Sequence, residues 1–170
     1  MSYLQSLNIK NIDYLFLTHP HEDHIGGTDA VIKDFNIGIL YMAKATSTTN
    51  TFKDVVTTMG IKGLKAPLPT LDSSFKLGSA NYTILSPINS KSEDTNTYSI
   101  LLKVAFGNNK FVFAGDAQAS NEQDMIIKVY NLSANVLNIG HHGSHTSTSN
   151  SATTPTPSAP KTVITASSEN

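Results

Sequence analysis

The stretch that decides the fold is residues 18–27, which read Thr-His-Pro-His-Glu-Asp-His-Ile-Gly-Gly. The apolar run 14–17 precedes it, so we expect a strand that ends in a polar loop. Pro20 biases the residue before it toward extended backbone, and in an extended segment His19 and His21 point the same way. Imidazole is a common ligand of transition metals, so these two side chains can share one ion.

Two more candidate ligands, Asp23 and His24, follow immediately. The chain must then change direction, and the double glycine at 26–27 makes a tight turn sterically feasible. After that turn the two side chains would face a second ion beside the first. This stretch therefore predicts a site for two metals, while Glu22 is expected to point away into solvent.

The remaining histidines form a second cluster at His141, His142 and His145. Between the two clusters, the apolar run 111–114 ends in a glycine and Asp116, which places a carboxylate at a turn after a strand. The clusters can act together only if the fold brings them together. The chain has no cysteine, so any metal must be held by nitrogen and oxygen ligands.

Composition limits the class of protein. The chain has 170 residues, a single-domain length, and 39% of them are hydrophobic, which is enough for a core. Its formal net charge of -1 argues against a broad cationic surface for nucleic acid. No apolar run approaches the roughly 18 to 20 residues of a membrane span, and no signal peptide is visible. We therefore expect one soluble domain over residues 1–170.

The residues of the first loop resemble the HxHxDH signature of the metallo-β-lactamase fold superfamily, whose members use it to bind one or two metal ions. Segments 111–116 and 139–144 resemble two later superfamily motifs, which supply a bridging aspartate and a further histidine. The His-His-Gly-Ser form of the last segment and the Asn-Thr-Tyr-Ser run at 96–99 look like the hydrolase domain of ComEC-type competence proteins and their stand-alone relatives. The similarity runs over essentially the whole chain.

The resemblance implies a centre of two divalent ions, Zn or Mn, with one ion held by His19 and His21 and the second by Asp23, His24 and His141. The implied ligands are His19, His21, Asp23, His24, Asp116 and His141. Asp116 would bridge the ions. The superfamily pattern of a glycine followed by the ligand favours His141 over His142.

Two residues, the ligand Asp23 and the neighbouring His142, are also expected to take part in catalysis. Asp23 would steer the attacking water, and His142 would donate a hydrogen bond to the developing oxyanion, a role that Ser144 could also fill. Many superfamily enzymes carry one more histidine ahead of the aspartate, where this chain has Asp-Thr-Asn-Thr at 94–97. ComEC-type domains lack that histidine as well.

The implied fold class is α/β: a metallo-β-lactamase-like four-layer αββα sandwich, missing its N-terminal strands and its extreme C-terminus. Superfamily domains begin with two or more strands before the HxHxDH loop, so we expect a partial domain or a divergent short version. An unpaired sheet edge would then favour self-association.

Local patterns predict the individual elements. A first helix is expected to begin at Thr28, a second to be capped by Asn50 or Thr51 and to end at Gly60, and a third to be capped by Ser120. The expected strands span 36–41, 74–77, 81–86, 98–105, 110–114, 135–139 and 161–166. Segment 144–160, rich in Ser, Thr and Pro, is expected to be a surface loop.

The function implied by the resemblance is a metal-dependent hydrolase that uses a metal-activated water on phosphodiester substrates, DNA or a nucleotide. A lactamase or thioesterase would share the same centre, and a truncated, non-catalytic remnant is the third alternative. The near-neutral charge offers no argument for DNA. An extracellular or cell-surface location would follow if the full-length protein carries a signal or a membrane domain.

Overall fold

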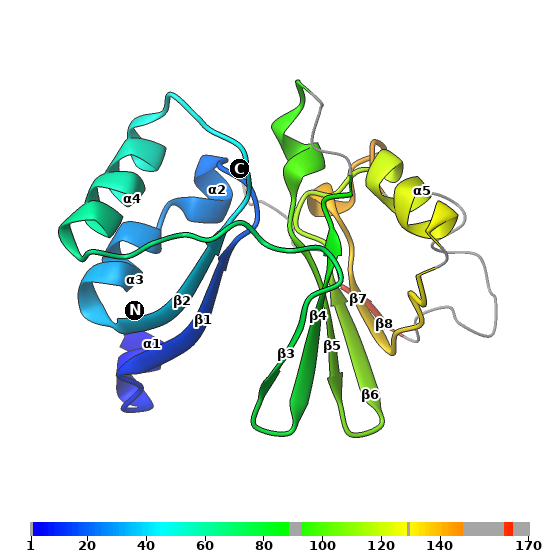
Figure 1. Cartoon of the computed structure of the whole chain (residues 1–170), viewed down its shortest axis with the longest axis horizontal. Coiled ribbons are helices and arrows are strands. Elements are labelled where there is room, and N and C mark those ends of the chain that lie inside the picture. Colours follow the sequence, from blue (N-terminus) through cyan, green and yellow to red (C-terminus); the bar gives the residue numbers. More distant parts are fainter. Residues whose placement is uncertain (1, 89–92, 129, 148–161, 165–170) are drawn as a thin grey trace. The chain divides into compact units, whose positions relative to one another are not determined.

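The computed structural model describes residues 2–88, 93–128, 130–147 and 162–164 (Figure 1). The chain divides into two compact units, Met1–Leu68 and Pro69–Asn170. Each unit has a hydrophobic core of its own. The single domain expected over 1–170 stays a prediction.

The first unit is built on two parallel strands with helices between and after them (Figure 1). Its elements are α1 (Ser2–Ser6), β1 (Asn11–Leu17), α2 (Glu22–Ile25), α3 (Thr28–Asp34), β2 (Asn36–Met42) and α4 (Asn50–Ile61). Parallel neighbours require a crossover connection, which α2 and α3 provide. The buried side chains that form the core are Leu17, Ile25, Ile32, Leu40, Val55 and Met59.

The ends of α4 differ from the prediction. Thr49 has extended backbone and accepts a hydrogen bond from the amide of Phe52 at 3.3 Å, so Thr49 is the N-cap and the choice of Asn50 or Thr51 was wrong. Gly60 lies inside the helix, and the left-handed glycine that follows the helix is Gly63, with φ 65°.

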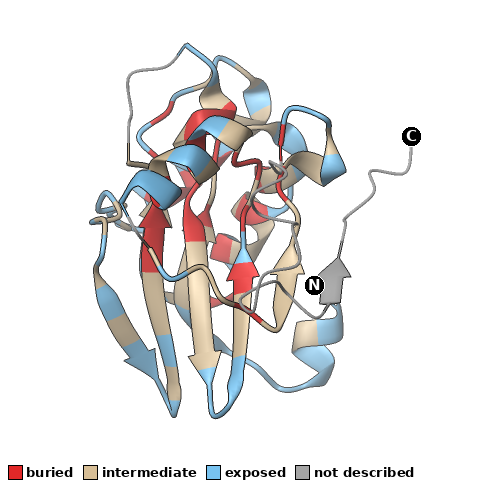
Figure 2. Ribbon diagram, turned by 90° about the vertical axis from the view of Figure 1, so that its right-hand side faces the viewer, coloured by how far each residue is buried: buried red, intermediate tan, exposed pale blue. Residues whose placement is uncertain are grey.

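The second unit contains a six-stranded sheet in the order β3-β4-β5-β6-β7-β8. Its elements are β3 (Ser74–Leu77), β4 (Ala80–Ser86), a 3-10 helix η1 (Thr95–Tyr98), β5 (Leu101–Phe106), β6 (Asn109–Phe113), α5 (Ala119–Ile127), β7 (Val136–Asn138), a 3-10 turn η2 (His141–Gly143) and β8 (Thr162–Ile164). The pairs from β3 to β6 are antiparallel, and β7 joins β6 and β8 in parallel. Figure 2 shows that the hairpin turns at one end of the sheet are exposed, while the buried residues of the strands lie toward the other end of the sheet.

Most of the expected strands are confirmed, and two details of the second unit are corrected. Tyr98 ends the 3-10 helix instead of beginning a strand. The N-cap of α5 is Gln118, whose amide donates to the Asn121 side chain at 3.0 Å, and not Ser120. Asn121 is 3% exposed, so burial in the unit's interior selects this cap over the local Ser-x-x-Gln pattern.

Two expectations remain, one on the surface loop and one on membrane-spanning segments. Residues 148–160 of the expected loop 144–160 lie outside the described residues. Among the helices of the described ranges, none has the length and apolarity that crossing a membrane requires.

Candidate metal centre

The first histidine loop follows β1 and is held by the short helix α2. His21 has extended backbone, with φ -80° and ψ 148°, as the sequence predicted. Its carbonyl accepts hydrogen bonds from the amides of His24 and Ile25, both at 3.0 Å. Ile25 is 2% exposed and packs in the core of the first unit, so the loop is anchored at its far end.

Three imidazoles gather on this loop. The ring centroid of His19 lies 4.6 Å from that of His21 and 4.1 Å from that of His24. His19 is 1% exposed, and its Nδ1 lies 3.2 Å from the hydroxyl of Thr18. His19 and His21 have metal-binding atoms within 4.8 Å of each other, which is compatible with the predicted pairing on one ion.

Asp23 and His24 form a second pair of candidate ligands. Nε2 of His24 lies 3.4 Å from Oδ2 of Asp23. Two atoms that bind one tetrahedral ion with bonds of about 2.0 to 2.2 Å lie roughly 3.3 Å apart, so this separation suits a shared ion. Glu22 is exposed, as expected, and accepts a hydrogen bond from the hydroxyl of Thr51 at 2.8 Å.

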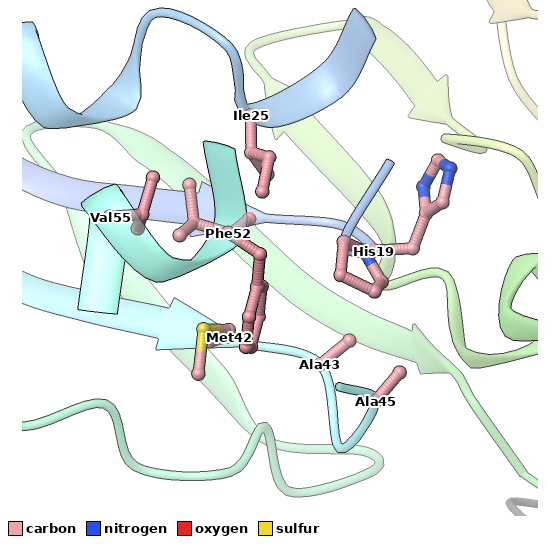
Figure 3. A pocket seen from close by; sticks show the side chains of 9 residues that line it. His19, Ile25, Met42, Ala43, Ala45, Phe52 and Val55 are labelled. Atoms are coloured by element: carbon pink, nitrogen blue, oxygen red, sulfur yellow. The ribbon is translucent and has the colours of Figure 1, made fainter. Parts of the chain in front are cut away.

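An apolar pocket of the first unit lies beside His19 (Figure 3). Its lining residues are Leu17, His19, Pro20, Ile25, Met42, Ala43, Ala45, Phe52 and Val55. Figure 3 shows the imidazole of His19 directed away from the side chains of Phe52 and Met42. His19 therefore borders the apolar pocket, while its ring points away from the apolar side chains of Phe52 and Met42.

Asp116 stands at the turn after β6 in the second unit. The left-handed Gly115, with φ 54°, precedes it, and the amide of Asp116 donates to the Ser99 hydroxyl at 3.1 Å. Asp116 is 2% exposed and Ser99 is fully buried. A carboxylate is rarely buried without a paired charge or a metal, so this position is compatible with the predicted role of Asp116 as a ligand.

The second histidine cluster follows β7 on a turn with unusual backbone. His141, His142 and Gly143 are left-handed in succession, with φ of 49°, 53° and 78°. Such a conformation strains residues other than glycine, and it clusters at functional sites. The amide of His141 donates to the carbonyl of Gly115 at 3.1 Å, so this turn lies against the turn that carries Asp116.

The two histidines point to different partners. Nε2 of His142 lies 3.8 Å from Oδ1 of Asp116, with metal-binding atoms of the two residues within 4.8 Å. His141 instead places its Nδ1 2.9 Å from the hydroxyl of Thr146. The structure thus brings His142 beside Asp116, where the sequence pattern favoured His141. His145 is exposed, as a loop residue would be.

Sequence reasoning missed the polar residues that hold the Asp116 turn. Asn121 donates to the carbonyl of Thr97 at 2.8 Å, and Gln118 donates to the carboxylate of Asp94 at 2.6 Å. Together with Ser99, they fix the segment before β5 against the start of α5. Residues 96–99 were noticed only because they resemble a segment of ComEC-type domains. No local sequence pattern reveals which hydroxyl or amide group will bind a backbone group far away in the chain.

The donors present suit a divalent transition metal. They are imidazole nitrogens and carboxylate oxygens, the ligands that zinc, manganese and iron accept. Each unit supplies a nearly inaccessible donor, His19 in the first and Asp116 in the second. The separations within the Asp23–His24 and Asp116–His142 pairs are close to those of ligands on one ion.

Comparison with known proteins agrees with this chemistry. A family model described as the metallo-beta-lactamase superfamily matches residues 2–167. The chain is 27% identical to ComE operon protein 3 of Bacillus subtilis over 146 residues, covering 86% of this chain and 19% of that protein. It is 28% identical over 147 residues to competence protein ComA of Neisseria gonorrhoeae, with the same two coverages. The chain thus spans about a fifth of the length of these relatives.

A solved structure gives the same fold. CmlA, a diiron beta-hydroxylase from Streptomyces venezuelae, matches with a TM-score of 0.53 at 17% identity, covering 78% of this chain and 26% of that one. At this identity the likeness concerns the fold alone.

Proposed function

The chain belongs to the metallo-β-lactamase superfamily, and from this we propose that it is a metal-dependent hydrolase of phosphodiester bonds, in DNA or in a nucleotide. The buried carboxylate of Asp116, 3.8 Å from Nε2 of His142, is the observation that carries the proposal, because it offers a metal a nearly inaccessible oxygen ligand beside a partly exposed imidazole. The similarity to competence proteins supports DNA as the substrate and DNA uptake as the setting.

We assign two divalent ions, Zn or Mn, to the donors of the two units. One ion would be held by His19 and His21 and the other by Asp23 and His24, and Asp116 would be a ligand that they share. His142 replaces His141 in the set because it is the histidine beside Asp116. The proposed ligands are His19, His21, Asp23, His24, Asp116 and His142. When bound, such ions activate a water molecule and stabilise negative charge on the attacked group.

Other groups of the chain have complementary roles in this proposal. Asp23 has a side chain that is 51% exposed, so it would be accessible to the attacking water and could orient it. His141, oriented by Thr146, is left to contact the substrate. We also propose that the free edges of the β1–β2 sheet support self-association, since among the described strands these two pair only with each other.

The test measures hydrolysis of a bis-aryl phosphodiester, a β-lactam and a thioester by the whole chain with Mn²⁺ or Zn²⁺ added. We expect cleavage of the phosphodiester and a loss of more than about 100-fold for Asp116→Ala, because a metal ligand is removed. Asp54→Ala, which removes an exposed carboxylate of α4, is the matched control and should leave the rate unchanged.

Each alternative has its own result in this assay. Cleavage of the β-lactam or the thioester alone would contradict the phosphodiester assignment and keep the hydrolase. Equal rates for the chain and Asp116→Ala would contradict the proposed centre. No hydrolysis of any substrate by metal-loaded protein would favour a non-catalytic remnant.

A further inference from the structure

Asn96 is a buried side chain with an unsatisfied acceptor. It lies on the 3-10 helix η1 and is 7% exposed. Within the described ranges, no hydrogen-bond donor reaches its Oδ1, and this atom is itself buried. A buried acceptor without a donor destabilises a fold, so a native one requires an explanation such as a ligand that binds it.

The backbone around Asn96 is held without help from its side chain. Its amide donates to Oδ1 of Asp94 at 2.9 Å, and its carbonyl accepts from the amide of Ser99 at 3.0 Å. The next carbonyl, that of Thr97, accepts from the Asn121 side chain at 2.8 Å. The Asn96 amide group is therefore not needed to fix the loop that carries it.

This loop also positions the buried carboxylate. Ser99, bonded to the carbonyl of Asn96, accepts the amide hydrogen of Asp116 at 3.1 Å. Asn96 is thus linked to Asp116 through Ser99, within the same unit and by hydrogen bonds of ordinary length. The unsatisfied oxygen belongs to the segment whose Ser99 hydroxyl binds the amide of Asp116, the partner of His142 in the candidate ligand pair.

We propose that Oδ1 of Asn96 is an oxygen ligand of the ion held by Asp116 and His142, an inference that rests on the proposed function. A carbonyl oxygen only accepts, so it needs a cation or a donor, and the oxygens of a phosphodiester, which also only accept, cannot satisfy it. Amide oxygens prefer hard cations, so this ligand favours Mn²⁺ over Zn²⁺ at the position beside Asp116.

The experiment replaces the amide with an apolar group of similar size. For Asn96→Leu in the whole chain we expect Mn²⁺ to bind at least about tenfold more weakly by titration calorimetry, because a ligand is lost. In EDTA the same variant should unfold about 2 to 4 °C higher than the parent, because the unsatisfied acceptor is gone. Asn96→Asp, which keeps an oxygen, should bind Mn²⁺ at least as tightly as the parent.

Asn121 provides a matched control. It is also a buried asparagine, but its side chain donates to the carbonyl of Thr97 and to Ser86 and accepts from the amide of Gln118. Asn121→Leu should therefore unfold at a lower temperature in EDTA. The same substitution then has opposite effects on the stability of the metal-free protein at the two positions.

The result that overturns the inference is unchanged Mn²⁺ affinity in Asn96→Leu, or a metal-free Asn96→Leu that is less stable than the parent. Asp116→Ala separates this failure from that of the proposed function. If Asp116→Ala abolishes Mn²⁺ binding and Asn96→Leu leaves it intact, only the assignment of Asn96 is wrong. If neither variant weakens Mn²⁺ binding, the proposed metal centre is wrong as well.

Discussion

At the scale of single residues, Gly140 determines how closely the second histidine turn approaches Asp116. A Cβ at this position would lie 2.4 Å from the carbonyl oxygen of Ala117, which is a contact no side chain tolerates. The close approach allows the amide of His141 to reach the carbonyl of Gly115. The absence of a side chain at one position thus brings His142 within reach of Asp116.

Gly140→Ala should lower the free energy of unfolding by about 1 to 3 kcal/mol, as overpacking against backbone does, and should weaken Mn²⁺ binding. Urea denaturation and calorimetry measure the two effects. Gly60→Ala in α4 is the control, since a Cβ there meets nothing within 4 Å and should stabilise the helix by about 0.5 to 1 kcal/mol. A Gly140→Ala protein as stable as the parent would show that the two turns are not packed this closely.

At the scale of elements, the start of α4 illustrates how a cap is chosen. Asn50, Thr51 and Thr49 are all suitable residue types, and the sequence does not distinguish them. Thr49 is the cap because its backbone is extended and its hydroxyl meets the amide of Phe52, a residue that lines the pocket beside His19.

Thr49→Ala should cost about 1 kcal/mol of stability, the usual value for a lost N-cap. Thr51→Ala, whose hydroxyl bonds only the exposed Glu22 carboxylate among the described partners, should change stability by less than about 0.5 kcal/mol. Thermal unfolding of both variants in EDTA shows which substitution lowers the stability more. The reverse order would restore Thr51 as the cap.

Most elements could be predicted because their signals are local. The expected strands 74–77 and 110–114 agree with β3 and β6 within a residue, since alternating and β-branched patterns reflect one buried face. The cap of α5 could not be predicted, because Gln118 is selected by the burial of Asn121 against Thr97, a contact between segments far apart in the chain.

At the scale of the whole molecule, the chain has two cores and a two-stranded sheet in the first unit with unpaired edges among the described strands. Edge strands expose backbone groups that can pair with another copy. Ile39 on β2 is 39% exposed and adds an apolar surface at this place. Self-association is therefore expected to involve β1 or β2.

We expect the weight-average mass of the chain to rise with concentration in light-scattering measurements, and Ile39→Lys to suppress the rise, because charge on an edge strand opposes pairing. Ile61→Lys is the matched control, since Ile61 is 79% exposed and lies at the end of α4, not on a strand. A monodisperse monomer at high concentration would contradict the proposal.

The sequence by itself determined the chemistry of the candidate centre and the family of the fold. The absence of cysteine left only nitrogen and oxygen donors, and the resemblance of the first loop and the Gly-Asp turn to superfamily motifs indicated the family that the family model confirms. Only the tertiary structure decided that His142, and not His141, lies beside Asp116, and that Asn96 is buried with an unsatisfied oxygen. The reason is physical. The type of a residue fixes what its side chain can bind, but the direction in which the side chain points depends on backbone contacts. A contact such as that between Gly140 and Ala117 joins segments apart in the chain, so neighbouring residues in the sequence do not reveal it.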